Sequence, residues 1–312
     1  MKAVVINNYG NKDQLTMEEI DKPEITDDQV LVEVHATSIN PIDWKLREGY
    51  LKEMIDFEFP IILGWDAAGI VKEKGKNVTK FNIGDRVFAR PDLTRYGTYA
   101  EYAAIDEKLL AKIPENINFE EAAAVPLAGL TAWQCLVDFS EIKDGDKVLV
   151  HAGSGGVGSF AIQLAKHFGA YVATTASGEN QDWVTELGVD RFINYKEEDF
   201  SEVLEEFDIV VDTIGGDVQS KSYQVLKEGG RLVSIVQPPD EEEAEKYRVK
   251  AGFHWLEPKG EQLAKIAELM KTGELTPVIG HHFEFSEDGL KEAHATSETH
   301  HAKGKIAISI KK

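Results

Sequence analysis

The feature that most constrains this chain is a glycine-rich turn between a short apolar segment and a helical pattern. The segment Val148–His151 is largely apolar and β-branched, and apolar side chains recur with helical spacing over residues 157–168. Between them, Gly153, Gly155 and Gly158 give the spacing G-x-G-x-x-G. A strand, a glycine turn and a helix in this order distinguish the motif from an ordinary glycine-rich loop.

Each glycine of this motif has its own physical reason. The first permits a tight turn, the second lets the backbone approach a pyrophosphate, and the third lets the helix pack close to the strand. The free N–H groups at the start of the helix favour bound phosphate. The motif therefore predicts a dinucleotide site with backbone contacts from Gly153, Gly155, Gly156, Val157 and Gly158.

The composition excludes several classes of partner. The formal net charge of −21 argues against binding to nucleic acid or to an anionic membrane, because phosphate groups would be repelled. No apolar run reaches membrane-spanning length, and the segment Met1–Gly10 lacks the pattern of a secretory signal. A single cysteine, Cys135, excludes an internal disulfide and suits a reducing compartment, so we expect a cytoplasmic protein.

The sequence pattern divides the chain into two regions with different predicted secondary structure. Roughly 120 residues precede the dinucleotide-binding unit; they are mostly strand-like, as in Val30–Ala36, with frequent turn signals that suggest a barrel-like β domain. From about Glu120 onward, helical and strand-like segments alternate, which favours a doubly wound parallel sheet. The expected strands are Val148–His151, Tyr171–Ala176, Arg191–Tyr195, Phe207–Thr213 and Arg231–Val236.

The end of the chain adds one more strand. Lys305–Ile310 alternates between apolar and polar residues, and we expect it to return to the first domain. The predicted domains are therefore residues 1–121 with 258–312, and residues 122–257. The acidic run Asp240–Glu245 is expected to be a solvated loop or helix face, and Glu261–Met270 an amphipathic helix.

The order of these parts resembles the medium-chain dehydrogenase/reductase superfamily, and within it the zinc-free quinone oxidoreductase branch, the zeta-crystallin-like reductases. The resemblance implies a GroES-like β-barrel catalytic domain joined to a Rossmann doubly wound domain. The segments that carry it, besides the glycine turn, are KAVVINNYG at the start, NPIDWKLREGY (40–50), PIILGWDAAGIV (60–71), FNIGDRVFA (81–89), GTYAEYAAI (97–105), AAAVPLAGLTAW (122–133) and HAKGKIAISI near the end.

The zinc ligands of the related alcohol dehydrogenases have no counterpart here. Their cysteine region reads Ser38-Ile39-Asn40-Pro41, and their Gly-His-Glu segment reads Gly64-Trp65-Asp66. Catalytic zinc needs three protein ligands and an open position, so we predict a zinc-free enzyme. His281 and His282 would be poor joint ligands, because neighbours on a strand point to opposite faces.

The second strand of the dinucleotide unit bears on the choice between NADPH and NADH. An NAD-preferring fold usually carries a carboxylate at the end of this strand, whereas Tyr171–Ala176 is followed by Ser177, whose hydroxyl can donate to a 2′-phosphate. By resemblance, Tyr195 reaches the same phosphate. The lysine that the family often adds is missing, and Arg191 or Lys303 is left to compensate. We therefore expect NADPH, with NADH as the alternative.

Four further cofactor contacts follow from position. Thr131 resembles a residue near the nicotinamide-side phosphate or ribose. Ile214 follows an expected strand where a doubly wound sheet opens its crevice, and Val236 and Gln237 follow the next strand, where they are candidates for the nicotinamide carboxamide.

The resemblance implies hydride transfer from the reduced nicotinamide to quinones or α,β-unsaturated carbonyls, which need less polarisation than simple ketones. Asn40, Asp43 and Tyr50 are the catalytic candidates: Asn40 beside the nicotinamide or a substrate oxygen, and Tyr50 or water as proton donor. The ordinary interpretations are a turn for Asn40 and a helix N-cap for Asp43.

Two alternatives remain open at this stage: an enoyl-thioester reductase of the same superfamily, and a non-catalytic NADPH-binding structural or sensor protein. The family commonly forms dimers, so we expect a homodimer, with the segment Val233–Val236 as one sheet edge where a second copy could pair.

Overall fold

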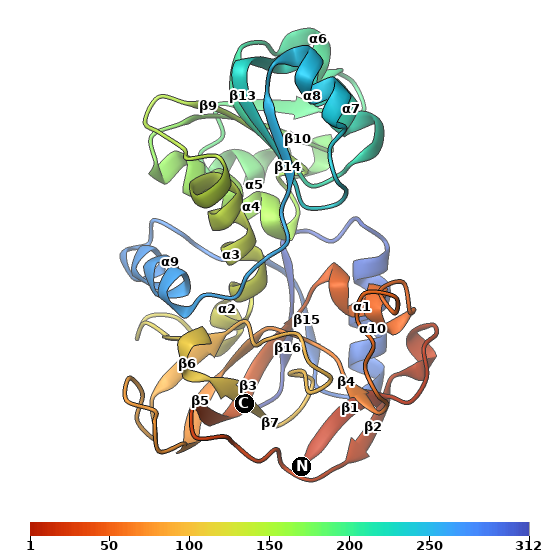
Figure 1. The fold of residues 1–312 in the computed structure, drawn as a ribbon, viewed down its shortest axis with the longest axis vertical. Coiled ribbons are helices and arrows are strands. Elements are labelled where there is room, and N and C mark those ends of the chain that lie inside the picture. Colours follow the sequence, from red (N-terminus) through yellow and green to blue (C-terminus); the bar gives the residue numbers. More distant parts are fainter. Residues whose placement is uncertain (312) are drawn as a thin grey trace. The chain divides into compact units, whose positions relative to one another are not determined.

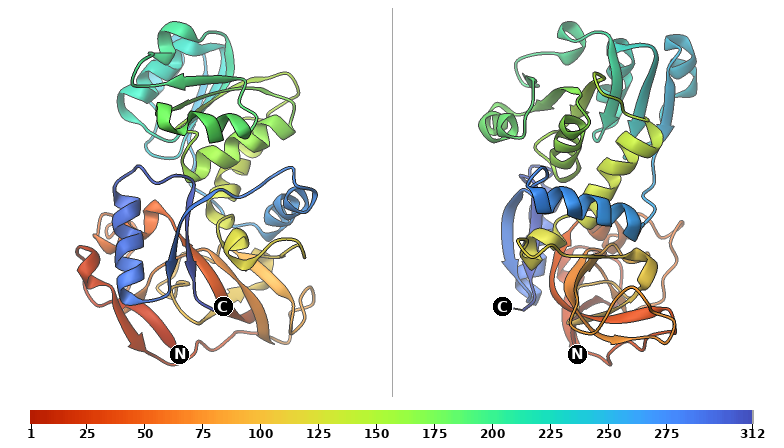
Figure 2. Two further views of the ribbon diagram at one scale, coloured as in Figure 1. Left: turned by 180° about the vertical axis from the view of Figure 1, so that it is seen from behind. Right: turned by 90° about the vertical axis from the view of Figure 1, so that its left-hand side faces the viewer.

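The computed structural model describes residues 1–311 and divides the chain into two compact units (Figures 1 and 2). Unit 1 comprises Met1–Leu130 and the segment from Pro258 onward, and unit 2 comprises Thr131–Glu257. The sequence places the first boundary after residue 121, whereas unit 1 continues through Leu130. The short helix Phe119–Ala123 lies beyond the predicted boundary and packs on four strands of unit 1, so it stays with that unit.

Unit 2 is built on one parallel six-stranded sheet in the order β11-β10-β9-β12-β13-β14. Numbered from the first strand of the unit, this is 3-2-1-4-5-6, the order of a doubly wound dinucleotide-binding fold, so the prediction of a Rossmann-type sheet is confirmed. The strands are β9 (Lys147–His151), β10 (Tyr171–Ala176), β11 (Arg191–Asn194), β12 (Phe207–Asp212), β13 (Leu226–Ser234) and β14 (Lys250–Phe253).

Helices connect these strands. Parallel strands with helices on their faces are buried on both sides, and accordingly every residue of β12 is buried. The middle of α4, from Gly158 to Ala165, is buried as well. The helices of unit 2 are the π-helix η3 (Gln134–Phe139), α4 (Gly156–His167), η4 (Gly178–Asn180), α5 (Gln181–Glu186), α6 (Phe200–Val203), α7 (Gly216–Val225) and α8 (Glu241–Tyr247).

The expected sheet edge at Val233–Val236 is wrong. β13 is an inner strand, because β14 pairs with it in parallel from Arg231 opposite Lys250 to Ser234 opposite Phe253. The edges of this sheet are β11 and β14 instead. The sequence offered no strong signal for β14, which is four residues long and contains a glycine, Gly252.

Unit 1 is mainly β structure, as the frequent turn signals predict. A three-stranded sheet has the order β2-β1-β4, and a seven-stranded sheet has the order β15-β16-β3-β5-β6-β8 with β7 paired to β3. The strands are β1 (Lys2–Ile6), β2 (Thr16–Glu19), β3 (Gln29–Ile39), β4 (Ile61–Ile62), β5 (Ala67–Lys74), β6 (Arg86–Ala89), β7 (Tyr102–Asp106), β8 (Leu110–Lys112), β15 (Ile279–Glu284) and β16 (Lys305–Ser309).

The long strand β3 organises this unit. One edge pairs with β5, while the other edge is shared between β7 along its first half and β16 along its last four residues. The pairing of Ile306 with Ile39 confirms that the end of the chain returns to the first unit. It also places the start of β16 beside the end of β3, which is where the catalytic candidates begin.

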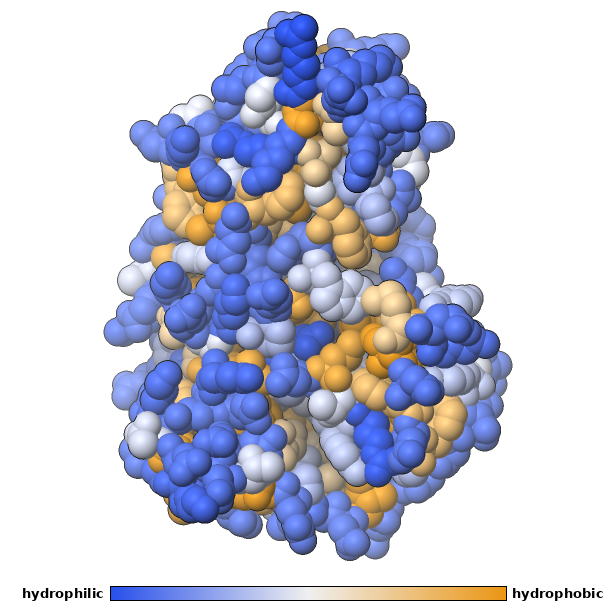
Figure 3. Space-filling model, viewed as in Figure 1, coloured by the Kyte–Doolittle hydropathy of each residue, from blue (hydrophilic) through white to orange (hydrophobic). Residues whose placement is uncertain are grey.

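The helices of unit 1 cover its sheets. They are η1 (Lys12–Gln14), α1 (Pro41–Arg47), η2 (Glu107–Leu109), α2 (Phe119–Ala123), α3 (Pro126–Trp133, which crosses the boundary), α9 (Gly260–Thr272) and α10 (Glu287–Glu298). Within residues 1–311, no helix has both the length and the apolar character that crossing a bilayer would require. Figure 3 shows hydrophilic residues over most of the visible face of each unit, in keeping with the charge of −21.

Candidate functional site

The glycine turn joins β9 to α4, as predicted. A Cβ atom at Gly158 would overlap the carbonyl oxygen of Ala152, and one at Gly153 would overlap the hydroxyl of Thr174 on β10. A Cβ at Gly155 meets only the Ala152 oxygen, at 3.3 Å. Gly153 and Gly158 therefore lack a side chain because neighbouring atoms leave no room for one. Gly155 instead leaves free space beside the N-terminus of α4.

The turn has the features that a pyrophosphate requires. Gly155 is the N-cap of α4 and has an extended backbone. Gly156 and Val157 are therefore the first two residues of this twelve-residue helix, and their N–H groups lie at its N-terminus. The first N–H groups of a helix have no partner inside it and lie at the positive end of its dipole. These residues fit the phosphates of a dinucleotide.

The residues after β10 form a small polar cluster. The Ser177 hydroxyl is buried; it donates to Glu179 Oε1 at 3.0 Å and accepts from Asn180 Nδ2 at 2.9 Å. Tyr195 follows β11 and is exposed, and its N–H donates to the carbonyl of Ala176, the residue before Ser177. The structure thus brings Ser177 and Tyr195 to the same end of the sheet. Lys196 Nζ lies 3.8 Å from Glu179 Oε1, so a cation that was not among the predicted residues lies beside this cluster.

A second cluster joins the ends of β12 and β13. Asp212 Oδ1 accepts from the N–H groups of Ile214 and Gly215 at 3.0 and 2.8 Å, and Asp212 Oδ2 accepts from Gln219 Nε2 at 2.9 Å. Gln219 Oε1 in turn accepts from Gln237 Nε2 at 3.2 Å. Ile214 and Gln237 are therefore brought together, and Val236 lies beside Gln237 with its side chain partly exposed. Sequence reasoning missed Asp212, although a carboxylate at the end of a buried strand is a usable signal.

Two predicted cofactor residues lie outside these clusters. Thr131 is a buried residue of α3 at the start of unit 2. Lys303 belongs to unit 1, two residues before β16, where its backbone lies against Gly280. Their cofactor contacts stay predictions.

The end of β3 and the start of β5 and β16 meet in a buried polar cluster of unit 1. Asn40 Nδ2 donates to Asp66 Oδ2 at 2.7 Å, and Ser38 Oγ donates to the same oxygen at 2.6 Å. Lys305 Nζ donates to Asn40 Oδ1 and lies 3.4 Å from Asp66 Oδ2. We call Ser38, Asn40, Asp66 and Lys305 the lysine cluster. Asn40 is one of the predicted catalytic residues, whereas its partners Asp66 and Lys305 are not.

A second buried network begins at Asp43, which is not the N-cap of α1 but its third residue, where its side chain accepts from the backbone of the N-cap residue Asn40. Asp43 Oδ2 accepts from the Asn40 N–H at 2.8 Å and from the Tyr99 hydroxyl at 2.9 Å. Tyr99 lies 3.1 Å from His294 Nε2, and His294 Nδ1 lies 3.0 Å from Arg47 Nη1. An arginine can only donate, so the His294 proton is on Nε2 and points to the Tyr99 oxygen.

Burial governs the electrostatics of both groups of residues. Asp43 is fully buried, and the loss of hydration raises its pKa to about 7 against the hydrogen bonds from Asn40 and Tyr99. Burial lowers the pKa of Lys305, a shift opposed by the carboxylate of Asp66. His294 is neutral, because burial lowers its pKa to about 3.

Tyr50 is not part of these networks. It follows α1, is 69% exposed, and packs edge-on against Trp44 with 6.2 Å between ring centroids. The structure therefore brings Asn40 and Asp43 together but leaves the third catalytic candidate at the surface.

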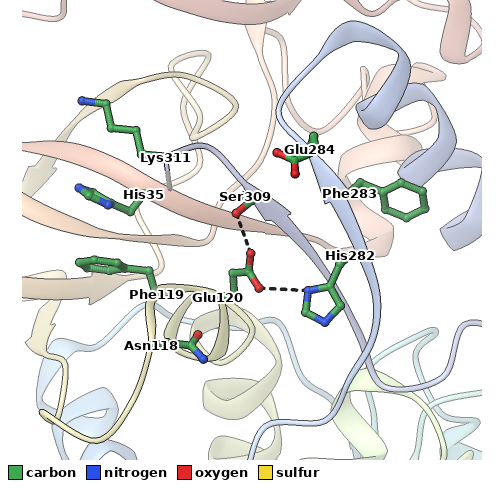
Figure 4. A pocket seen from close by; sticks show the side chains of 9 residues that line it. All are labelled: His35, Asn118, Phe119, Glu120, His282, Phe283, Glu284, Ser309 and Lys311. Atoms are coloured by element: carbon green, nitrogen blue, oxygen red, sulfur yellow. Dashed lines mark hydrogen bonds and ion pairs between the residues drawn. The ribbon is translucent and has the colours of Figure 1, made fainter.

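The two histidines of β15 have different surroundings. His281 and His282 face opposite sides of the strand, and His282 Nδ1 contacts Glu120 Oε2 at 3.1 Å. Glu120 also accepts from Ser309 Oγ at 2.6 Å (Figure 4), in a cavity of about 410 Å³ within unit 1. Across residues 1–311, no three His, Cys, Asp or Glu side chains are grouped to hold a metal ion.

Comparisons with known proteins agree with this architecture. A family model described as "Alcohol dehydrogenase GroES-like domain" matches residues 26–115, and one described as "Zinc-binding dehydrogenase" matches residues 187–308. The chain is 39% identical to an NADPH-dependent alkenal/one oxidoreductase of Arabidopsis thaliana, covering 99% of this chain and 79% of that protein.

Solved structures are similar over the full length. The quinone oxidoreductase of Coxiella burnetii superposes with a TM-score of 0.91 at 37% identity, covering 100% of this chain and 99% of that one. The Escherichia coli quinone oxidoreductase complexed with NADPH gives a TM-score of 0.88 at 26% identity, covering 99% and 100%. These matches confirm the predicted fold class, a GroES-like domain with a Rossmann domain.

Proposed function

The chain belongs to the medium-chain dehydrogenase/reductase superfamily, in its quinone oxidoreductase branch, and from this premise we propose that it is an NADPH-dependent reductase of quinones or α,β-unsaturated carbonyls. The observation that carries the proposal is the combination of a pyrophosphate-binding turn in unit 2 with the lysine cluster in unit 1. The NADPH-dependent relative and the NADPH complex of another relative support the choice of cofactor.

The geometry of unit 2 supports an assignment of the cofactor contacts. The N–H groups of Gly156 and Val157 bind the pyrophosphate, and Ser177, Tyr195 and Lys196 bind the 2′-phosphate. When bound, the reduced nicotinamide supplies the hydride.

Asn40 is the group in unit 1 suited to an acceptor oxygen. One N–H of its side-chain amide is used by Asp66 and its oxygen accepts from Lys305, which leaves one N–H to donate. In the proposed reaction this N–H stabilises the negative charge that develops on the acceptor oxygen. Asp43 Oδ2 accepts from the Asn40 N–H and from the Tyr99 hydroxyl, so in this proposal it positions Asn40. Tyr50 or water delivers the proton.

Zinc independence is part of the proposal, and the lysine cluster supports it. The positions that resemble zinc-ligand segments hold Asn40 and Asp66, and the ammonium group of Lys305 lies against both. A buried cation at this place repels a second cation. The donor set of the cluster therefore suits hydrogen bonding rather than zinc.

The assay that tests the function is NADPH oxidation with 9,10-phenanthrenequinone and a panel of enones. We expect acceptor-dependent oxidation, and we expect Asn40→Ala to lower kcat while the affinity for NADPH is retained. Activity confined to coenzyme A thioesters would instead establish the enoyl-thioester reductase. Tight NADPH binding without oxidation by any acceptor would establish the non-catalytic binding protein.

Cofactor preference gives a separate prediction. Ser177→Asp places a carboxylate at the 2′-phosphate site and is expected to weaken NADPH binding about tenfold, while NADH binding changes little. Glu179→Gln removes the carboxylate that competes for Ser177 and Lys196, so it is expected to strengthen NADPH binding. Fluorescence titration with both cofactors measures each affinity.

The matched control is Glu186→Gln, the same charge change at an exposed position of α5. If Ser177→Asp binds NADPH as tightly as the unmodified protein, Ser177 does not contact the 2′-phosphate.

Assembly and location extend the proposal. We propose a homodimer that pairs along the exposed edge of β14, where Phe253 and Trp255 are partly exposed. The single buried Cys135 and the acidic composition are consistent with the cytoplasm.

A further inference from the structure

We propose that Lys305 is a positioning residue for catalysis: its ammonium group fixes the orientation of the Asn40 amide and strengthens the one amide N–H left to bind the acceptor oxygen. This inference rests on the proposed function and extends it to a residue at the far end of the chain.

All three N–H donors of the Lys305 ammonium group have partners inside the protein. The residue is 3% exposed, and its Nζ donates to Asn40 Oδ1, to the carbonyl of Ile39 at 3.2 Å and to Asp66 Oδ2 at 3.4 Å. An ammonium group has three donors, so none remains for solvent or substrate. Lys305 therefore acts through Asn40.

Lys305 and Asp66 together fix which end of the Asn40 amide faces each of them. Lysine can only donate and an ionised carboxylate can only accept, so Asn40 must present its oxygen to Lys305 and its nitrogen to Asp66. Asp66 is held in turn by Ser38 Oγ at 2.6 Å and by the N–H of Leu127 at 2.7 Å, on its two different oxygens. A flip of the Asn40 amide would lose both contacts at once.

The same contacts make the amide a better donor. A cation bound to the amide oxygen draws electron density from the amide nitrogen, and hydrogen bonds linked in this way reinforce one another. The effect is larger where water is excluded, and Asn40 is 2% exposed. The remaining N–H is thus held in one orientation and polarised before the acceptor binds.

Stability alone does not account for the buried charges. A buried ion pair can often be replaced by uncharged residues of similar volume without loss of stability, whereas removal of one partner is costly. A functional role and a structural role therefore predict different results when both charges are removed together.

The experiment compares Lys305→Met, Asp66→Asn and the double variant in thermal unfolding and steady-state kinetics. Each single variant is expected to lower the melting temperature, because one buried charge loses its partner. The double variant is expected to recover the melting temperature, while its kcat stays about tenfold below that of the unmodified protein and its KM for NADPH changes little. The control is Lys76→Met with Asp27→Asn, an exposed ion pair of the same unit.

The outcomes separate the inference from the proposed function. If kcat recovers together with the melting temperature in the double variant, Lys305 is structural and the inference is overturned. If Asn40→Ala loses activity while the double variant keeps the kcat of the unmodified protein, only the positioning role fails. If none of the acceptors tested supports NADPH oxidation by the unmodified protein, the proposed function fails, and the inference fails with it.

Discussion

Replacing Gly158 with alanine is expected to destabilise unit 2 by about 3 kcal/mol and to abolish NADPH binding at ordinary concentrations. The added Cβ would overlap the carbonyl oxygen of Ala152, which belongs to the backbone of the turn and cannot rotate away. Ala152 already has a positive φ of 50°, an uncommon conformation for a residue with a side chain. The helix α4 must therefore move away from β9, which displaces the N–H groups that bind phosphate.

The contrasting variant is Gly155→Ala. Its Cβ meets only the Ala152 oxygen at 3.3 Å, and the backbone of Gly155, with φ of −86° and ψ of 176°, suits alanine. We expect its melting temperature to stay close to that of the unmodified protein, while NADPH affinity falls about tenfold because the methyl group occupies the space needed by the pyrophosphate.

Thermal unfolding without cofactor and fluorescence titration with NADPH distinguish the two roles. A Gly158→Ala protein as stable as the unmodified one would show that close packing of α4 on the turn is not required. Equal losses of stability in both variants would contradict the separate roles assigned to the two glycines.

Acidification is expected to destabilise unit 1 through His294. Burial lowers the pKa of this ring to about 3 in the folded protein from 6.5 in the unfolded chain, so the unfolded chain takes up the proton first as the pH falls. The stability associated with the neutral ring is complete above pH 6.5 and is lost as the pH falls toward 3. Between about pH 7 and about pH 5, the loss is about 2 kcal/mol.

His294→Gln is expected to remove this pH dependence, because an amide can accept from Arg47 and donate to Tyr99 without titrating. Asp43 acts in the opposite direction, since its pKa is raised from 3.8 to about 7 and it favours the folded protein at low pH. Only the difference between variant and unmodified protein therefore isolates His294.

Urea unfolding at the two pH values, followed by circular dichroism, measures this difference. His301→Gln, at an exposed position after α10, is the control and is expected to keep the pH dependence of the unmodified protein. If the stability of His294→Gln changes between the two pH values by the same amount as that of the unmodified protein, rather than differing by about 2 kcal/mol, His294 is not the group responsible.

The parallel sheet of unit 2 could be predicted because its signals are local. The inner strands β9 and β12 are short apolar runs followed by turn residues, as is the second half of β13, whereas its first half, with two glycines, was not predicted. The glycine motif fixes where the sheet begins. β14 was missed because its four residues carry no such run and are held by pairing with β13. The acidic run Asp240–Glu245 is compatible from its sequence with a loop or a helix face, and most of it is helical because the side chain of Asp240 caps α8.

The candidate site was only partly predictable, because some of its residues follow from local signals and others from tertiary pairing. Ser177, Tyr195 and the glycines lie at strand ends, where the order of the sheet places them by rule. The partners of Asn40 depend on tertiary pairing: Lys305 reaches it from 265 positions away, through the register of β16 on β3. No local pattern distinguishes that lysine from an ordinary surface residue at the start of a strand.

The return of β16 to β3 sets the order in which the protein can be completed during synthesis. The segment that forms unit 2 leaves the ribosome as one continuous stretch and can fold while the rest of the chain is still being made. The strand that supplies Lys305 is translated after all of unit 2, so β3 and Asn40 have no partner strand β16 until that unit has been made. Cofactor binding can therefore precede the assembly of the catalytic cluster in each newly made chain.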